Sequence, residues 1–464
     1  MALTVPQQPL ISLCPVGQDL IYTATDPAAV ASHFNVKYIA EVHMSVDPIN
    51  LSFAGDIIGI FKTSPNDAGV GMFNLRTVVE SFVNPDNIAI GSRYKTGTPP
   101  LMPVHLIDSY ALNQNIVRYL KIRFRVEGST TPGGTVLLID NYDSNELTIF
   151  NGYLKATDTL LEYNDSFGYD SSKFYLNPIL VAGDVPGRWL TNAPLIQYAN
   201  NTDYGTISVI STELSTDASL DQMALNYYDS SGVQLGSDII DNTNANGGYS
   251  TYTTESKNQL MHFGCYPGNL RNWASWFQTN FESVAYYIVA GVNLSVGDNI
   301  TETLRINLRC TNLKGFEPIR LTWLNQWGVW DYYTFNMKST KSISTKGSTY
   351  QQIEGTWNES TYKINGFKGG KKSFRVNATE KISMNTDFVS EAESEWFEEL
   401  INSPEVYILE GYKYESATSI AFNSFNTYVI PVRLTTSSFT RKTIANDKLM
   451  QYTFEVEKSK TLRT

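Results

Sequence analysis

Histidine and cysteine, the residue types most often used in catalysis and metal binding, are scarce in this chain of 464 residues. The histidines are His33, His43, His105 and His262, and the cysteines are Cys14, Cys265 and Cys310. His262 and Cys265 are spaced as two metal ligands can be, but a structural zinc site normally takes four ligands from two such close pairs. We therefore expect no metal and no cofactor. We interpret Cys265 and Cys310 as small buried hydrophobic residues, and an odd, sparse set of cysteines fits a reducing cytoplasm.

A glycine- and lysine-rich segment, GFKGGKKS at 366–373, superficially resembles a phosphate-binding loop. Lys371 stands where the second glycine of that motif is required, and the flanking residues are typical of strands. We interpret the segment as a basic hairpin turn. Its charged side chains could form a contact patch for an acidic neighbour: Lys363, Lys368, Lys371, Lys372 and Arg375.

Two acidic clusters, at 140–143 and 391–399, contain enough carboxylates for calcium binding or glycoside hydrolysis. The first lacks the spacing of an EF-hand, and the second lies on the exposed side of a predicted helix. Catalytic carboxylates must converge in space, which spacing along one sequence does not reveal. We expect that the chain is not an enzyme. A glycan-cleaving activity remains an alternative that the sequence does not support.

The composition indicates a globular chain: hydrophobic residues make up 42% and charged residues 17%, with 22 Phe, 8 Trp and 28 Tyr. The length predicts about three domains. A net charge of −11 disfavours nucleic acid and anionic lipid as partners. The most apolar stretch, 284–292, is too short to cross a bilayer, and the first residues lack the features of a secretory signal, so we expect no membrane insertion.

Apolar and polar residues alternate with a period of two in several segments, including 120–126, 304–310 and 450–456. This pattern is typical of strands with one buried face, and turn-forming residues separate the segments. The sequence therefore predicts an all-β fold of multiple antiparallel β-sandwich domains with hairpins.

One short amphipathic helix is predicted near 391–402. Ser390 and Glu393 form a capping box, the apolar positions from Trp396 to Ile401 lie on one face, and Pro404 ends the segment. We expect this helix in a C-terminal sandwich at 313–464. A central sandwich would occupy 191–312, and an N-terminal β-sandwich region of one or two subdomains would occupy 1–190.

The segment 321–335 contains three tryptophans and is predicted to form a hairpin with its turn at 325–329. The simpler interpretation is that its aromatic residues pin a core across strands. The functional interpretation is a contact platform for a protein or a sugar, formed by Trp327, Trp330 and Tyr332. Trp327, at the tip of the turn, is then the residue expected to be exposed.

Short blocks over most of the chain resemble virion structural proteins of tailed bacteriophages. The blocks are FNVKYIAEV (34–42), FKTSP (61–65), GVGMFNLR (69–76), WLTNAP (189–194), RLTWLN and DYYTFN (320–325 and 331–336), PEVYI (404–408), YVIPV (428–432) and YTFEV (452–456). The C-terminal region is similar in plan to distal-tail and baseplate β-sandwiches. The resemblance implies a tail, neck or baseplate component with no catalytic residues to transfer.

These observations predict a non-enzymatic virion subunit that is made in the host cytoplasm and located in the tail or neck region. Its expected partners are other virion proteins and further copies of itself in a ring, joined through hairpins and edge strands. The interface hypothesis names Trp327, Trp330, Tyr332, Lys368, Lys371 and Lys372. The alternative is a host-surface or carbohydrate-binding adhesin whose exposed aromatic rings stack on a host-surface glycan.

Overall fold

The computed structural model is built mostly of strands, which make up 51% of it against 13% for helices. This confirms the predicted all-β class. Leaving out scattered single residues and pairs within them, the structure describes residues 2–46, 56–89, 102–155, 171–176, 186–211, 220–241, 259–309, 315–410, 428–440 and 450–463. Cys310 lies outside the described residues.

The chain divides into two compact units. Unit 1 comprises Met1–Cys310, Leu324–Asp331 and Tyr412–Phe425, and unit 2 comprises Thr311–Trp323, Tyr332–Gly411 and Asn426–Thr464. The change of unit at residue 311 lies close to the expected boundary at 313. The expected boundary at 190 does not separate compact units, because residues on both of its sides belong to unit 1.

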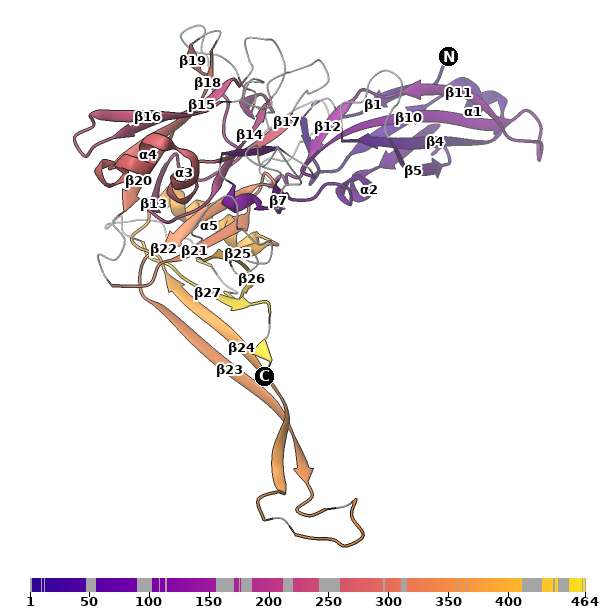
Figure 1. Cartoon of the computed structure of the whole chain (residues 1–464). Helices are drawn as coiled ribbons and strands as arrows, with labels where there is room; N and C mark the ends of the chain where they lie inside the picture. The colour runs from indigo at the N-terminus through magenta and orange to yellow at the C-terminus, as the bar shows by residue number, and fades with distance from the viewer. Residues whose placement is uncertain are drawn as a thin grey trace. The chain divides into compact units, whose positions relative to one another are not determined.

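A six-stranded and a three-stranded sheet form the first part of unit 1 (Figure 1). The larger sheet has the order β2 (Leu13–Pro15), β12 (Leu147–Phe150), β10 (Val117–Ser129), β4 (Phe34–Ser45) and β5 (Asp56–Thr63), with β11 (Leu137–Asp143) also paired to β10. The smaller sheet has the order β1 (Thr4–Gln7), β3 (Ile21–Thr25) and β6 (Val70–Asn74). Short helices α1 (Pro27–Ser32) and α2 (Arg76–Glu80) accompany them.

The core of this part follows the predicted alternation. Leu120, Ile122, Phe124 and Val126 of β10 are fully buried and share one hydrophobic cluster with side chains of both sheets. Phe124, for example, contacts the Tyr22 ring with a centroid separation of 5.6 Å. The alternating positions of β10 therefore fill the sandwich interior, as their period of two requires.

The second part of unit 1 contains three more sheets. One has the order β13 (Ile196–Asn200), β20 (Leu304–Arg309), β18 (Tyr286–Asn293), β15 (Gln222–Tyr228) and β16 (Gln234–Asp241), with β19 (Asp298–Asn299) on β18. The others are β14 (Thr206–Ser211), β17 (Gln259–Gly264) and β9 (Tyr110–Leu112), and the pair β7 (Ile88–Ala89) and β8 (Met102–Pro103). The helical segments are α3 (Pro267–Trp273), α4 (Ser275–Asn280) and the 3₁₀ turns η2 (Val104–Leu106), η3 (Ser171–Phe174) and η6 (Phe281–Ser283).

Strand pairing explains why residue 190 is not a unit boundary. β9, from the N-terminal half, pairs with β17, and a single core cluster joins Leu13 and Phe150 to Leu190 and Leu260. Hydrogen bonds and shared burial therefore connect both sides of that position.

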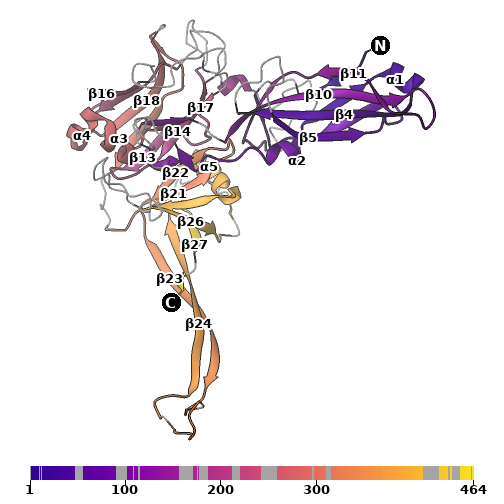
Figure 2. The same ribbon diagram turned by 45° about the vertical axis from the view of Figure 1, so that its right-hand side comes forward.

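Unit 2 is organised around an eight-stranded sheet (Figure 2). Its order is β22 (Trp330–Phe335), β21 (Ile319–Leu324), β25 (Val406–Leu409), β26 (Val429–Leu434), β27 (Thr453–Lys458), β24 (Gly370–Asn385) and β23 (Ser339–Gln352), with β28 (Leu462–Arg463) on β24.

The predicted amphipathic helix near 391–402 is confirmed as α5 (Glu391–Asn402). Ser390 and Glu393 make the predicted capping box, with both reciprocal hydrogen bonds present. The Trp396 ring contacts the ring of Trp323 on β21 at 4.8 Å, and Phe397 contacts Phe454 on β27 at 5.4 Å. The apolar face of α5 therefore packs against the sheet, as its spacing predicts.

Candidate interaction surface

The turn of the tryptophan-rich hairpin, 325–329, is built around one asparagine. Asn325 accepts hydrogen bonds at its side-chain oxygen from the backbone N–H groups of Trp327 and Val329, at 2.9 and 3.2 Å. Its side-chain N–H donates to the carbonyl of Leu190 at 2.8 Å. The polar atoms of Asn325 are thus used inside the protein, and they fix the path of the turn.

Trp327 is buried, with 3% of its surface exposed. Its ring meets the edge of Phe174 at 4.8 Å between centroids, and Lys173 Nζ lies 5.0 Å from its ring centre. The expectation that Trp327 is the exposed tip of the hairpin is wrong, because the turn contributes this ring to the core cluster of unit 1.

The two other aromatic residues of the interface hypothesis are also buried. Trp330 donates its indole N–H to the carbonyl of Asp86 at 2.8 Å and meets the His105 ring edge-on. Tyr332 lies beneath the guanidinium of Arg320, 5.2 Å from its ring centre. Buried rings cannot stack on a sugar, so the expected exposed platform is corrected to a core element, in agreement with the simpler interpretation.

The three lysines of the interface hypothesis lie elsewhere, on a hairpin ribbon formed by β23 and β24. Lys368 lies in the connection between the two strands, and Lys371 and Lys372 lie at the start of β24; all three are exposed. The segment 366–373 is therefore part of a basic hairpin, as predicted. These lysines belong to unit 2, whereas Trp327 belongs to unit 1.

The ribbon extends beyond the strands that hold its base (Figure 1). β23 and β24 pair from Ser339 and Met384 out to Gln352 and Gly370. β27 pairs with β24 only at residues 381–385, and β28 pairs only at 377 and 378. From Val376 towards the connection between the two strands, the described residues form a ribbon of two strands only. We call residues 345–376 the outer ribbon.

A β-bulge interrupts the outer ribbon. Ser348 pairs with Arg375 and Thr349 pairs with Ser373, which leaves Phe374 as the extra residue on β24. Bulges redirect side chains and increase local twist. Phe374 is 79% exposed. Among the described ring contacts, its ring meets only that of Tyr350, edge to face, with 6.4 Å between the ring centroids.

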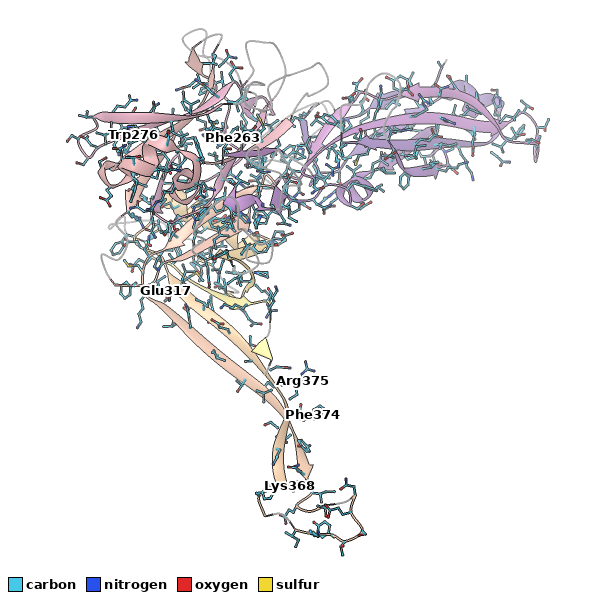
Figure 3. All side chains as sticks on the ribbon, viewed as in Figure 1. Phe263, Trp276, Glu317, Lys368, Phe374 and Arg375 are labelled. Carbon is cyan, nitrogen blue, oxygen red and sulfur yellow. The ribbon has the colours of Figure 1, made fainter. Side chains whose placement is uncertain are left out.

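Large apolar side chains are exposed along the ribbon. They are Ile343, Tyr350, Ile353, Tyr362, Ile364, Phe367 and Phe374. Phe367, beside Lys368 in the connection, is 81% exposed. Figure 3 shows Phe374 and Arg375 together on the ribbon and Lys368 at its far end. Such a concentration of exposed apolar surface makes the ribbon a candidate contact site.

The charge of the outer ribbon is opposite to that of the whole chain. It carries six basic residues and two acidic residues, a net charge of +4, whereas the chain carries −11. The remainder of the chain therefore carries −15. The basic residues are Lys346, Lys363, Lys368, Lys371, Lys372 and Arg375, and the acidic residues are Glu354 and Glu359.

The base of the ribbon is held by packing and ion pairs. Ile382 and Met384 are buried in the sheet. Lys381 Nζ lies 2.9 Å from Glu455 Oε1 on β27, and hydrogen bonds from Lys381 and Thr435 hold the pKa of Glu455 below its usual value. A second pair joins Lys458 and Glu380 at 3.0 Å. The base is thus part of the sheet, whereas no third strand pairs with the outer ribbon among the described residues.

A buried serine, histidine and aspartate form a network in unit 1 that sequence reasoning did not identify. Ser208 Oγ lies 2.8 Å from His262 Nδ1, and His262 Nε2 lies 3.2 Å from Asp86 Oδ2. Catalytic triads use the same residue types, but all three side chains are buried. A reacting group must approach the serine oxygen to about 3 Å, so this placement favours a structural network.

No local signal in the sequence indicates this network. Ser208 and His262 are directly paired on β14 and β17, whereas Asp86 is 176 residues from His262 in sequence. The sequence does indicate the exposed ribbon: residues 339–352 are strand-forming but have no continuous apolar face, which is typical of a strand without a buried side.

Within the described ranges, no group of three or more His, Cys, Asp or Glu side chains is placed to hold a metal ion. No helix in the described part of the chain is long and apolar enough to cross a membrane. Comparisons with protein-family models and with curated proteins find no match to this chain.

Proposed function

We propose that this chain is a non-enzymatic structural subunit of a tailed-phage virion, located in the tail, baseplate or neck. It joins neighbouring virion subunits through the β23–β24 ribbon and through edge strands. The observation that carries the proposal is the outer ribbon, on which large apolar side chains are exposed beside a concentrated positive charge.

The energetics of the ribbon favour a bound state. An isolated two-stranded ribbon is marginally stable in water because it has no core of its own. Burying an exposed side chain such as Phe367 or Phe374 against a partner contributes about 1.5–3 kcal/mol. The ribbon therefore gains stability when another surface covers it, as in an assembled particle.

Edge strands add further contact sites. β5, β13 and β16 are each the last strand of their sheet in the described part of unit 1. Each exposes a large apolar side chain: Ile60, Ile196 and Ile239. Unpaired strand edges are templates for another chain, which suits a subunit that assembles with copies of itself or with other virion proteins.

The phage assignment rests on the sequence blocks that resemble virion structural proteins. Two of these blocks, RLTWLN and DYYTFN, form β21, β22 and the ends of their turn, so the resemblance includes a structural element of the core. The adhesin alternative loses its main argument, since the rings assigned to sugar stacking are buried.

Cryo-electron microscopy of particles of the phage that encodes the chain tests this proposal. We expect density for the chain in a closed ring on the tail axis, with the ribbon covered by a neighbouring subunit. Absence of the chain from purified particles overturns the proposal. Density only at a fibre tip that contacts the host surface supports the adhesin instead.

A truncated variant tests the role of the ribbon. Lys346 and Asn377 are paired across β23 and β24, so a two-residue Asn-Gly turn can replace residues 347–376. We expect the variant to fold, with circular dichroism matching the intact chain apart from the deleted strands, and to be excluded from particles. Normal incorporation of the truncated chain contradicts the assigned role of the ribbon.

A further inference from the structure

An acidic surface in unit 2 complements the basic ribbon. The 25 residues of 386–410 include eight acidic residues and no basic residue. The acidic residues are Asp387, Glu391, Glu393, Glu395, Glu398, Glu399, Glu405 and Glu410. Most of them lie on or beside α5.

The accessible carboxylates of α5 form a stripe. Glu391, Glu395 and Glu398 follow one another at spacings of four and three residues, which places them on one face of the helix. Glu391 and Glu395 are exposed, and Glu398 is partly exposed. Phe388, just before the helix, exposes half of its surface. We call Phe388 and the three glutamates the acidic face of α5.

This face has the features that the outer ribbon needs in a partner. The ribbon presents Lys368, Lys371 and Lys372 together with exposed Phe367 and Phe374. Lysines pair with carboxylates, and an aromatic side chain can cover another apolar side chain. Every copy of the chain carries both surfaces.

The ribbon tip lies at the opposite end of unit 2 from α5 (Figures 1 and 2). β23 alone has 14 residues, which spans about 46 Å at the rise of an extended strand. Because β24 is fixed in the sheet through β27, the ribbon cannot turn back onto the helix of its own copy. The complementary surfaces can meet only between copies.

We propose that the outer ribbon of one copy binds the acidic face of α5 on a second copy. This inference rests on the proposed structural function and identifies the partner of its ribbon. The contact joins two different surfaces, so it is head-to-tail and closes into a ring when the rotation between successive copies permits. Its charge pairs also make assembly sensitive to salt.

Charge reversal tests the pairing in the full-length chain. One variant carries Lys368→Glu, Lys371→Glu and Lys372→Glu, and the other carries Glu391→Lys, Glu395→Lys and Glu398→Lys. Glu393 is retained because it caps the helix. Each variant alone should self-associate at least about tenfold more weakly than the unmodified chain in sedimentation velocity, and mixing the two should restore association.

A matched control reverses two charges at other exposed acidic positions, away from the edge strands. Asp67→Lys with Glu282→Lys alters exposed residues of unit 1 and should leave association unchanged. Hydrogen exchange in the peptide 391–402 checks that α5 still forms in the glutamate variant. An unmodified chain that stays monomeric at high concentration overturns the inference, as does a mixture that fails to recover association.

The same variants separate this inference from the proposed function. Exclusion of the lysine variant from particles, together with normal incorporation of the glutamate variant, leaves the structural function standing but assigns the ribbon to a different virion protein. A fluorescent single-stranded oligonucleotide tests the other partner of a basic, aromatic surface. Oligonucleotide binding that requires the ribbon lysines, without self-association, overturns the inference.

Discussion

Trp327 donates its indole N–H to the side-chain oxygen of Asn192 at 3.1 Å, although 135 residues separate them in the sequence. A second hydrogen bond runs beside it, from the side-chain N–H of Asn192 to Oε1 of Gln326, at 2.9 Å. The turn of the tryptophan-rich hairpin is thereby held within the core of unit 1.

Replacement of Trp327 should destabilise unit 1. Trp327→Ala removes a buried ring that contacts Phe174 and Phe150, so we expect a loss of about 3–5 kcal/mol in the free energy of unfolding. Phe367→Ala, at an exposed position of the ribbon, should change it by less than about 0.5 kcal/mol. Urea unfolding of both variants measures the difference, and equal stabilities contradict the burial of Trp327.

The elements that sequence reasoning predicted well are those with a local cause. The alternation of residues 120–126 depends only on the pleat of a strand, and the start of α5 depends on two side chains three residues apart, Ser390 and Glu393. Such patterns are complete within a short window, so the structure reproduces them.

Whether the aromatic hairpin is exposed or buried depends on residues that are distant from it in the sequence. Phe174 and Asn192 cover Trp327, and nothing near residue 327 in the sequence specifies that they do. The network of Ser208, His262 and Asp86 was not predicted for the same reason, because its members are far apart in the sequence. For the ribbon, the lysines were recognised from their local density, but the exposed Phe374 depends on a bulge that only strand pairing reveals.

Gly328 should not tolerate a side chain. Its φ is +76°, and a Cβ atom would clash with the backbone oxygen of Asn151. Gly133 has a similar φ of +71° but open space around it, so Gly133→Ala reports the left-handed strain alone, about 1–2 kcal/mol. Gly328→Ala should cost clearly more. Equal losses in urea unfolding would mean that the turn moves away from Asn151 without penalty.

Ser208 should not react as a hydrolase nucleophile in the folded protein. Its side chain is buried on β14, and its hydroxyl is engaged with His262 on the neighbouring strand β17. We expect a fluorophosphonate probe to leave Ser208 unlabelled, as judged by peptide mass spectrometry. Specific labelling that disappears in Ser208→Ala would show that substrate reaches the network and would support an enzymatic role.

The capping box should account for much of the local stability of α5. Ser390→Ala removes the side-chain oxygen that accepts from the Glu393 N–H, at a cost of about 0.5–2 kcal/mol. Ser390→Gly should cost only a few tenths, about the value for a glycine cap. Hydrogen exchange in the peptide 391–402 should quicken in the alanine variant more than in the glycine variant. The reverse order would contradict the capping role.

Alkaline pH should destabilise unit 1 through Cys14. Burial raises the pKa of this thiol from 9.0 to about 12, opposed in part by a hydrogen bond from Gln18. Above pH 9 the unfolded chain releases the proton while the folded chain keeps it. The free energy of unfolding therefore falls as pH rises between 9 and 12, by up to about 1.4 kcal/mol per pH unit.

Urea unfolding with reductant, at about pH 8 and about pH 10, should show a smaller decrease for Cys14→Ala than for the unmodified chain. Tyrosines with raised pKa values, such as Tyr407, remain in both chains and act in the same direction, so the difference between the two chains isolates the thiol. An identical decrease in both would mean that Cys14 ionises in the folded state as readily as in the unfolded state.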